Sequence, residues 1–487
     1  MQKTVHFETL GCRLNQDESE GAARCFFSAG FKCDLENISA SSLEDENVIL
    51  CIINTCTVTA KAEQKARRII RLLLKKYKNS CILVTGCYAE VEADEIKKIE
   101  PSRICIVPGT KKFILSYIAQ MMKDKTEISC AELESFILQK EKDFEKSLAA
   151  KNLNFMLYTP VFEKHSRASI KVQDGCNNSC AFCRIHFARG KAVSLDVAEV
   201  VSRVRELENL GKKEVVFTGV NLTQYAGKYF ENDGDKSVEK IADFADLLKI
   251  VLEKTEKIFI RISSLYPQSV NEKFCSVIKN PRVAPSFHLS VQSGSDSILK
   301  EMNRPYDAQK VLSAAKMLRE AKENPFLSCD IIAGFPGETE DDFSKTCELC
   351  EKIGFAWIHA FPFSARPGTK AFSMKNQIPE RIKDERVKVL SKLALKGKVN
   401  YIDSFIGKEL FALSENSRSE WVLVAKENIL SPYVNAVTYN FIHVRCKSPK
   451  KIAGGTLLRV KILSSLPLLI QEGREIEAEA EILDVIS

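Results

Sequence analysis

The sequence lacks any long hydrophobic run. Its 487 residues include no stretch close to the roughly 18 consecutive apolar residues that a membrane-spanning helix needs. The first ten residues, MQKTVHFETL, also lack the apolar core of a secretory signal. We therefore expect a cytoplasmic protein without a membrane partner.

A strong charge of either sign is missing as well. The 71 basic and 64 acidic side chains leave a formal charge of +7, a mild excess that is compatible with a nucleic-acid partner without indicating one. Hydrophobic residues at 45% and charged residues at 28% exclude an intrinsically disordered chain. The length predicts about two to four domains.

Cysteine, by contrast, is abundant, with 17 residues. Because the cytosol keeps thiols reduced, we do not expect these cysteines to form structural disulfides. We expect some to be metal ligands and the others to be small hydrophobic core residues. Cys347 and Cys350 form a C-x-x-C pair on a helical pattern, and without a partner pair we interpret them as core residues or chance.

The first part of the chain alternates short apolar runs with helical patterns. This alternation predicts βαβ units and a doubly wound parallel sheet within residues 1–127. The predicted strands lie in KTVHFETLG, ENVILCIINT, SCILVTG and RICIVPG. Residues 128–165 are highly charged, and we expect a helical connector there.

A second alternation occupies residues 166–400 and predicts a partial TIM-like (β/α)6 barrel with its working groups at the strand C-termini. The six strands are expected in ASIKVQDG, EVVFTGV, KIFIRISS, PSFHLSVQ, FLSCDIIAGFP and WIHAFPFS. The basic amphipathic helix PERIKDERVKVLSKLALKGKVN leads to residues 401–487, where short strands predict a small β-barrel. Those strands are expected in ELFALSE, EWVLVAKE, YNFIHVRC, TLLRVKILSS and EIEAEAEI.

Three cysteines lie within eight residues in DGCNNSCAFCRIHFARG: Cys176, Cys180 and Cys183, called the central trio below. Thiolates are soft ligands that select zinc or iron–sulfur clusters. A cubane of four irons held by three cysteines keeps one iron open for a cofactor, whereas His186 would complete a closed zinc site. The trio follows a predicted strand at the start of a barrel, and the aromatic residue Phe182 directly precedes its last cysteine. That combination resembles the radical S-adenosylmethionine (SAM) superfamily, whose open iron binds SAM.

Three further cysteines are far apart in the sequence: Cys12, Cys56 and Cys87, called the N-terminal trio below. Each follows the C-terminal end of a predicted strand. Because these ends meet at one edge of a doubly wound sheet, we expect the three thiols to lie close together. Chance placement remains the alternative for this trio.

Several motifs together resemble the methylthiotransferase family: GCRLNQDES, NTCTVT, TGCYAE, DGCNNSCAFC, TGVNLTQY, QSGSDSILKEMNRPY and DIIAGFPGETEDDF. The resemblance implies an N-terminal cluster domain, a radical SAM barrel and a C-terminal TRAM barrel. GCRLNQ is most similar to the branch that modifies N6-threonylcarbamoyladenosine beside the tRNA anticodon. The alternatives are an isopentenyladenosine target, a ribosomal-protein aspartate, or a non-enzymatic, zinc-stabilised RNA-binding protein.

The resemblance also implies two 4Fe–4S clusters and SAM. The central trio would hold the cluster that reduces SAM to methionine and a 5′-deoxyadenosyl radical, which removes the hydrogen from adenine C2. The N-terminal trio would hold the cluster that carries the sulfur, which a second SAM methylates before transfer. A sulfur donor and an electron donor such as a flavodoxin or ferredoxin are expected partners.

Five residues are predicted to contact SAM: Gly219, Arg261, Ser290, Gln292 and Gly334. All lie in motifs at predicted strand ends, where glycine allows close approach, although a turn or a structural polar residue would explain each equally well. After ARGK the family usually has further arginines, whereas this chain has Val193 and Leu195. An anion contact expected there is lost or moved.

The helical segment after Cys56 is basic. We expect Lys65, Arg67, Arg68 and Arg71 to bind RNA phosphates because they lie beside the N-terminal trio, although a solvated helix face is the alternative. The tail from residue 402 has 10 basic and 11 acidic residues. It therefore lacks the electrostatic signature of a phosphate-binding domain, and only shape or stacking contacts are expected from it.

Overall fold

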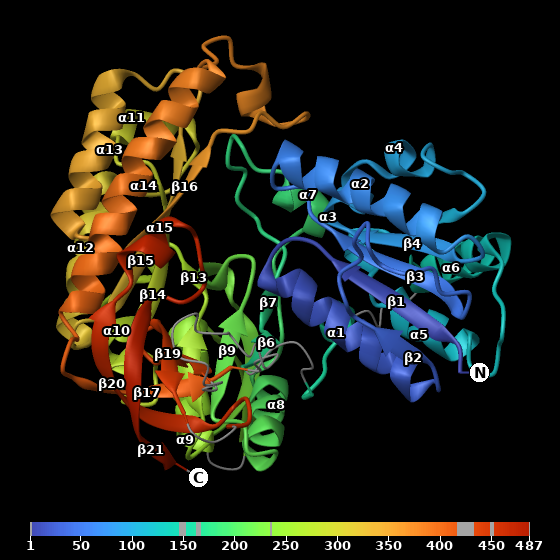
Figure 1. The fold of residues 1–487 in the computed structure, drawn as a ribbon, viewed down its shortest axis with the longest axis horizontal. Coiled ribbons are helices and arrows are strands. Elements are labelled where there is room, and N and C mark those ends of the chain that lie inside the picture. Colours follow the sequence, from blue (N-terminus) through green and yellow to red (C-terminus); the bar gives the residue numbers. More distant parts are fainter. Residues whose placement is uncertain are drawn as a thin grey trace, which may run out of the picture.

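The computed structural model describes residues 2–145, 152–161, 167–233, 236–415, 433–448 and 452–486. Figure 1 shows the blue first domain beside a green-to-orange barrel, with the red C-terminal barrel packed against the latter. None of the helices in these ranges combines the length and the apolar character of a membrane span.

The first domain contains a five-stranded parallel sheet of order β2-β1-β3-β4-β5. Its strands are β1 (Thr4–Thr9), β2 (Lys32–Asp34), β3 (Val48–Thr55), β4 (Cys81–Gly86) and β5 (Ile104–Ile106). Its helices are α1 (Arg13–Ser28), α2 (Ala60–Lys76), α3 (Cys87–Val91), α4 (Ala93–Lys97), α5 (Ile114–Met121) and α6 (Cys130–Glu145), with 3-10 turns η1 (Gly109–Lys111) and η2 (Leu153–Phe155). The predicted doubly wound sheet is confirmed, and only the short β2 was not expected.

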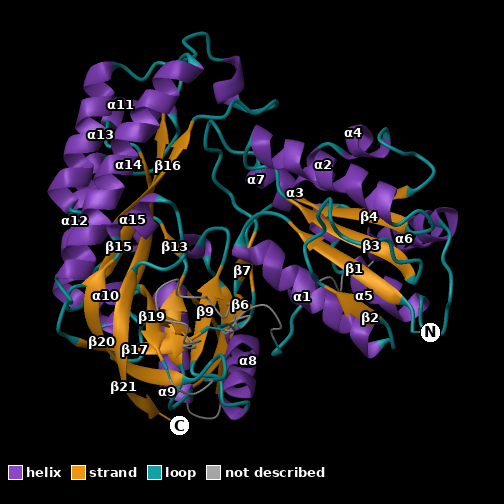
Figure 2. Ribbon diagram, in the orientation of Figure 1, coloured by secondary structure: helices purple, strands orange, loops and turns teal. Residues whose placement is uncertain are grey.

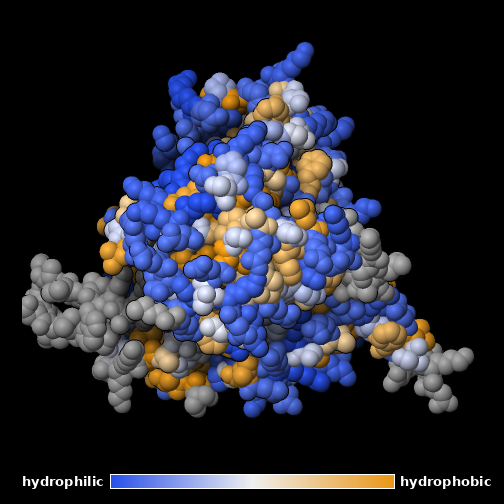
Figure 3. All heavy atoms as spheres, turned by 90° about the vertical axis from the view of Figure 1, so that its right-hand side faces the viewer, coloured by the Kyte–Doolittle hydropathy of each residue, from blue (hydrophilic) through white to orange (hydrophobic). Residues whose placement is uncertain are grey.

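Two apolar layers cover this sheet. Helices α1, α5 and α6 bury one face, and α2 and α4 bury the other, so that β3 is fully buried. Helix α6 falls in the segment predicted as a connector, yet its Leu133 and Ile137 belong to the same core as the sheet. The surface of this domain is mainly hydrophilic, with scattered hydrophobic side chains (Figure 3).

The central part forms the predicted open barrel of parallel strands. One sheet has the order β12-β9-β6, and the other continues as β13-β14-β15-β16, since Ser263 interrupts the third strand. The strands are β6 (Ala168–Lys171), β9 (Glu214–Thr218), β12 (Phe259–Ile262), β13 (Ser264–Leu265), β14 (Ser286–Gln292), β15 (Phe326–Ala333) and β16 (Trp357–Pro362). A short pair, β7 (Gln173–Asp174) and β8 (Val193–Ser194), and an unexpected hairpin, β10 (Gly227–Asp233) and β11 (Lys236–Ala242), are added to them.

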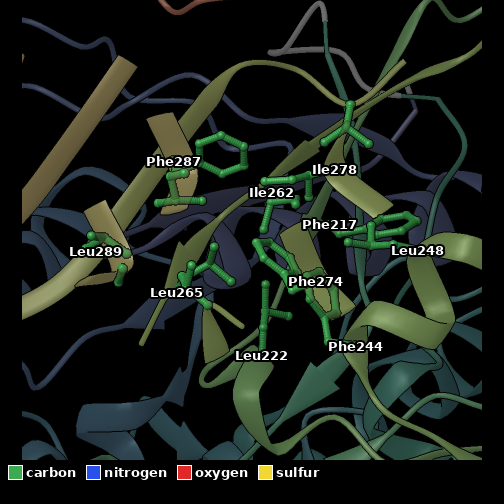
Figure 4. Close-up of a cluster of buried hydrophobic side chains, with 14 of the residues drawn as sticks. Phe217, Leu222, Phe244, Leu248, Ile262, Leu265, Phe274, Ile278, Phe287 and Leu289 are labelled. Carbon is green, nitrogen blue, oxygen red and sulfur yellow. The ribbon is translucent and has the colours of Figure 1, made fainter. Parts of the chain in front are cut away.

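Helices line the outside of this barrel (Figure 2). They are α8 (Val197–Asn209), α9 (Phe244–Lys254), α10 (Glu272–Ile278), α11 (Asp296–Glu301), α12 (Ala308–Ala321), α13 (Glu340–Ile353) and α14 (Glu380–Asp403). The short helix α7 (Ile185–Arg189) lies instead against α3 and η1 of the first domain. Short 3-10 turns are η3 (Leu222–Gln224), η4 (Pro267–Ser269) and η5 (Lys370–Ser373). Phe217, Phe274 and Phe287 belong to the buried core between strands and helices (Figure 4).

The C-terminal part is a closed barrel of order β17-β18-β19-β21-β20, as predicted. Its elements are β17 (Glu409–Ser414), β18 (Tyr433–Thr438), β19 (His443–Lys447), β20 (Leu457–Ser465), α15 (Pro467–Gln471) and β21 (Ala478–Ile486). Strand β18 was not expected, and the strand predicted over residues 420–427 lies outside the described residues. The basic helix α14 is confirmed as a helix, but Lys383, Arg386 and Lys398 are buried in ion pairs.

Candidate metal centres

The central trio lies in the loop between the short strand β7 and helix α7. Cys176 and Cys180 are buried and Cys183 is partly buried. Each sulfur accepts a hydrogen bond: from the Asn178 amide to Cys176 (3.4 Å), from Arg304 Nη1 to Cys180 (3.3 Å) and from the Ile185 amide to Cys183 (3.4 Å). Such donors stabilise negative charge on sulfur, so the loop is built to hold thiolates.

The three sulfurs are also close enough to affect one another. Burial, together with the charges of Cys180 and Cys176, raises the pKa of Cys183 to about 12. A metal cluster would reverse this effect, because a bound cation deprotonates a coordinating thiol. The donor set therefore fits a cluster with three cysteine ligands.

The N-terminal trio joins the ends of three adjacent strands. Cys12 follows β1 and caps α1, Cys56 follows β3, and Cys87 follows β4 as the first residue of α3. Gly11 has φ +104°, and a Cβ there would lie 3.0 Å from the Cys56 sulfur, so the Cys12 loop touches Cys56. Burial raises the pKa of Cys56 to about 11, with Cys87 and Cys12 adding to the shift. The sheet thus brings these three cysteines together.

A closed zinc site receives less support. The partly buried His186 packs against Phe187, with ring centroids 3.9 Å apart, and burial lowers its pKa. Within the described residues, no three His, Cys, Asp or Glu side chains gather tightly enough for one metal ion. A single zinc needs its ligands around one point, whereas a cubane accepts cysteines at separate corners. A cubane held by three cysteines would not need His186 as a ligand.

A buried ion network joins the two domains beside the N-terminal trio. Arg189 Nη1 lies 3.0 Å from Glu18 Oε1 and 2.9 Å from Asp174 Oδ1. Lys171 contacts the same two carboxylates at 2.7 and 2.8 Å, and Lys112 pairs with Glu18. Burial alone would raise the pKa of Glu18, but the three cations hold it well below its usual range. The charges of Cys87 and Cys12 also act on Arg189, which places a buried cation next to this trio.

A second network ties the central trio loop to the first domain. Arg184 directly follows Cys183 and contacts Glu63 at 3.4 Å and Glu92 at 2.6 Å. Arg366, beyond β16, pairs with the same Glu63. Sequence reasoning missed both networks, because the pairs that join the two domains are more than 90 residues apart along the chain.

Arg304 is a further site residue that sequence reasoning missed. Besides its contact with Cys180, its guanidinium donates to the Tyr266 hydroxyl at 3.0 Å and lies over the Tyr266 and Tyr306 rings at 4.2 and 4.9 Å. Burial would lower the pKa of Arg304, but the charges of Tyr306, Tyr266 and Cys180 raise it above its ordinary value. The motif KEMNRPY contains this arginine and could have identified it.

Comparison with known proteins agrees with this geometry. Residues 170–350 match the Radical SAM superfamily model, and residues 4–108 match the Uncharacterized protein family UPF0004. A "Threonylcarbamoyladenosine tRNA methylthiotransferase MtaB" from Treponema pallidum is 43% identical, covering 88% of this chain and 94% of the relative. One from Thermotoga maritima is 36% identical, covering 85% and 87%. The chain belongs to the radical SAM methylthiotransferase family.

Solved structures support the fold. The radical SAM methyltransferase TsrM from Kitasatospora setae, with cobalamin and a [4Fe-4S] cluster bound, has a TM-score of 0.50 at 12% identity, covering 76% of this chain and 74% of that one. Members of the methylthiotransferase family use SAM and two 4Fe–4S clusters.

The predicted SAM contacts of this methylthiotransferase lie in different settings. A Cβ at Gly219 would meet Leu222 at 2.6 Å, and one at Gly334, where φ is +75°, would meet Lys383 at 2.4 Å. Ser290 is partly buried, and its carbonyl oxygen accepts a hydrogen bond from Arg304 at 3.0 Å. Gln292 is buried with φ +74° at the end of β14. Close packing at Gly219 and Gly334, and the positive φ of Gly334, explain the need for glycine at these positions as well as a nearby ligand would.

Arg261 already has partners within the protein. Its buried guanidinium forms two hydrogen bonds with Glu214, at 2.9 and 3.0 Å, and a third with the Thr438 carbonyl oxygen of the C-terminal barrel. It therefore joins two domains, and because its buried Nη1 has no partner among the described residues, the predicted contact with SAM stays a prediction. Leu195 is fully buried in the barrel core, which explains why arginine is absent there, and Val193 is exposed on β8.

The predicted RNA-binding residues of the methylthiotransferase lie on α2, which begins four residues after Cys56. Lys65, Arg68 and Arg71 are exposed. Arg67 is partly buried and donates to the Tyr88 hydroxyl at 2.7 Å. Three of the four side chains are thus free to meet a phosphate, whereas Arg67 also holds α3, the helix that begins at Cys87.

Proposed function

We propose that this chain adds a methylthio group to C2 of N6-threonylcarbamoyladenosine next to the anticodon of tRNA. The observation that carries the proposal is the pair of cysteine trios, one at the edge of the first sheet and one at the mouth of the barrel, linked by buried ion networks. The family membership supports the chemistry, and the printed names of the two relatives support this substrate over isopentenyladenosine or a ribosomal-protein aspartate.

The central trio would hold one 4Fe–4S cluster with SAM, and the N-terminal trio would hold the other. Bound together, these groups supply the radical that activates the base carbon and the sulfur that replaces its hydrogen. The chain would orient and shield them. Arg304 neutralises negative charge at Cys180, and Arg189 does so beside Cys12 and Cys87.

The inner wall of the barrel offers a place for the base. His359 and Phe361 are exposed on β16 with ring planes 8° apart, and Phe361 is 45% exposed. On the neighbouring strands, His288 Nε2 lies 3.1 Å from Asp330 Oδ2. Partial desolvation inside the barrel and the charge of the nearby His288 lower the pKa of His359 to about 4, so its ring is neutral at physiological pH. An aromatic pair beside hydrogen-bonding groups suits a base extruded from its stack.

The partners follow from this reaction. The substrate is tRNA, whose phosphates would meet Lys65, Arg68 and Arg71 on α2. Each cycle also needs a sulfur donor and an electron donor, for which a flavodoxin or ferredoxin has suitable chemistry. We place the enzyme in the cytoplasm, where its tRNA substrate is found.

The deciding experiment incubates reconstituted protein with SAM, sulfide, a reductant and tRNA that carries either N6-threonylcarbamoyladenosine or N6-isopentenyladenosine. Nucleoside mass spectrometry should find the methylthio group only on the first. Product on the second tRNA alone would refute the substrate, and colourless zinc protein without product would refute the enzyme. Phe361→Ala should lower the yield while iron content stays unchanged, with exposed Phe372→Ala as the matched control.

A further inference from the structure

Three more thiols gather in the first domain, outside both trios. Cys130 Sγ lies 2.7 Å from Cys81 Sγ, and Cys105 Sγ lies 3.4 Å from the Cys130 carbonyl oxygen. Cys81 opens β4, Cys105 is the middle residue of β5, and Cys130 is the first residue of α6. Because Cys87 follows the other end of β4, about 20 Å away at strand geometry, this group is separate from the N-terminal trio.

The three thiols differ in access and reactivity. Cys81 and Cys105 are buried, whereas Cys130 is partly exposed in the first turn of a 16-residue helix. Helix N-termini and nearby cations favour the thiolate. Hydrogen bonds from Cys105 and Cys81 lower the pKa of Cys130, and the charges of Lys97 and Arg103 act in the same direction. Cys130 is therefore the nucleophile, and Cys81 is the thiol within its reach.

The direct contact between Cys130 and Cys81 indicates chemistry between the two thiols themselves. Two sulfurs in direct contact, one accessible and one buried, are the arrangement of an attacking and a resolving thiol.

We propose that Cys130 and Cys81 form a reversible disulfide when the protein meets a disulfide oxidant such as oxidised glutathione. The Cys130 thiolate attacks one oxidant sulfur and expels one glutathione thiolate. Cys81 then attacks the Cys130 sulfur and expels the bound glutathione as a thiolate, which takes up the proton that Cys81 releases. Two protein thiols are oxidised, and one glutathione disulfide is reduced to two thiols.

This bond would fasten the start of α6 to the central sheet. The cross-link would span the chain from residue 81 to residue 130, including β5 and α5. Such a bond restricts the unfolded chain, so the oxidised first domain should unfold at higher temperature than the reduced one. The site would make the stability of this domain respond to the thiol–disulfide balance around it.

The test uses the full-length protein, titrated with oxidised glutathione, alkylated and analysed by peptide mass spectrometry. We expect a peptide linking Cys81 to Cys130 that disappears with dithiothreitol and is absent from Cys130→Ser and from Cys81→Ala. Cys347→Ser is the matched control, since Cys347 is a partly exposed helical cysteine in the barrel, and it should keep the link. Circular dichroism verifies that each variant is folded.

Three outcomes would overturn the proposal: a link from Cys130 to Cys105 alone, glutathione retained on Cys130 without any cross-link, or oxidation of Cys347 before Cys130. The readout needs no tRNA and no methylthio product. Failure of this inference is therefore distinguishable from failure of the proposed function.

Discussion

Arg189 of the barrel and Glu18 of the first domain form a buried ion pair, with Nη1 3.0 Å from Oε1. Arg189 lies six residues after Cys183, and Glu18 lies six residues after Cys12. One pair of side chains therefore fixes the relative position of the two cysteine loops. For a sulfur bound on one side to meet an activated base on the other, this spacing has to be kept.

Breaking this pair should destabilise the protein strongly. Glu18→Gln leaves Arg189 and two lysines with one carboxylate fewer, and removing one partner of a buried pair costs about 3–5 kcal/mol. Denaturant unfolding monitored by far-ultraviolet circular dichroism measures the loss in the free energy of unfolding. As a control, Glu320→Gln removes the exposed pair with Lys316 and should cost less than about 1 kcal/mol. Equal losses in both variants would contradict the structural role of the network.

Asp17 should make stability depend on pH. Burial raises its pKa to about 6 from 3.8, although Arg13 and the Ser169 hydroxyl oppose the shift. Because the folded pKa exceeds the unfolded one, the contribution of Asp17 is complete below about pH 4 and is lost as pH rises through 6. Asp17→Asn should recover up to about 3 kcal/mol at pH 8 and little at pH 4. Exposed Asp94→Asn controls for the loss of one charge. If Asp17→Asn changed the free energy of unfolding by the same amount at pH 4 and at pH 8, the effect would be disproved.

Two separable clusters should be found. Anaerobic reconstitution is expected to give about eight irons per chain, four per cubane. Replacing Cys176, Cys180 and Cys183 by Ala should remove about half of the iron, as should replacing Cys12, Cys56 and Cys87. Iron analysis with EPR measures both, and Cys275→Ala is a control outside either trio. A single cluster in the unaltered protein would exclude this assignment.

The two trios should differ in their effect on SAM. Loss of any cysteine of the central trio should abolish reductive SAM cleavage, because the electron source is gone. Loss of Cys12, Cys56 or Cys87 should leave cleavage measurable while methylthio transfer ends. Chromatography of 5′-deoxyadenosine and of tRNA nucleosides from the same reaction separates the two results. If the N-terminal variants with an intact barrel cluster also lost cleavage, the division of roles would be wrong.

Helix α2 should carry most of the salt dependence of tRNA binding. Reversing Arg68 and Arg71 to Glu should weaken binding and flatten its dependence on salt, because phosphate contacts release counterions. Arg67 is left unchanged because it holds Tyr88. Deleting residues 402–487 should weaken binding with little change in slope, since that segment is nearly neutral. Filter binding at several salt concentrations measures both effects, with iron content as the control. If the tail deletion flattened the salt dependence and the arginine changes did not, the RNA would lie mainly on the tail.

The sequence by itself determined the features that depend on neighbours along the chain. Apolar runs such as those of β3 and β15 identify buried strands because every residue of such a strand, or every second one, must leave water. The central trio could be located from its spacing, since one loop carries all three cysteines. The N-terminal trio required one more rule, that parallel strands end at a common edge.

Only the tertiary structure decided which partner each polar side chain meets. Arg261 looks like a cofactor ligand because it is a polar residue in a barrel strand, yet Glu214 and Thr438 bind it. Arg189 and Arg304 are inconspicuous arginines until folding places them beside the cysteine sulfurs. The reason is physical: apolar burial follows local periodicity, whereas an ion pair or a thiol contact forms between atoms that only the complete fold brings within a few ångströms.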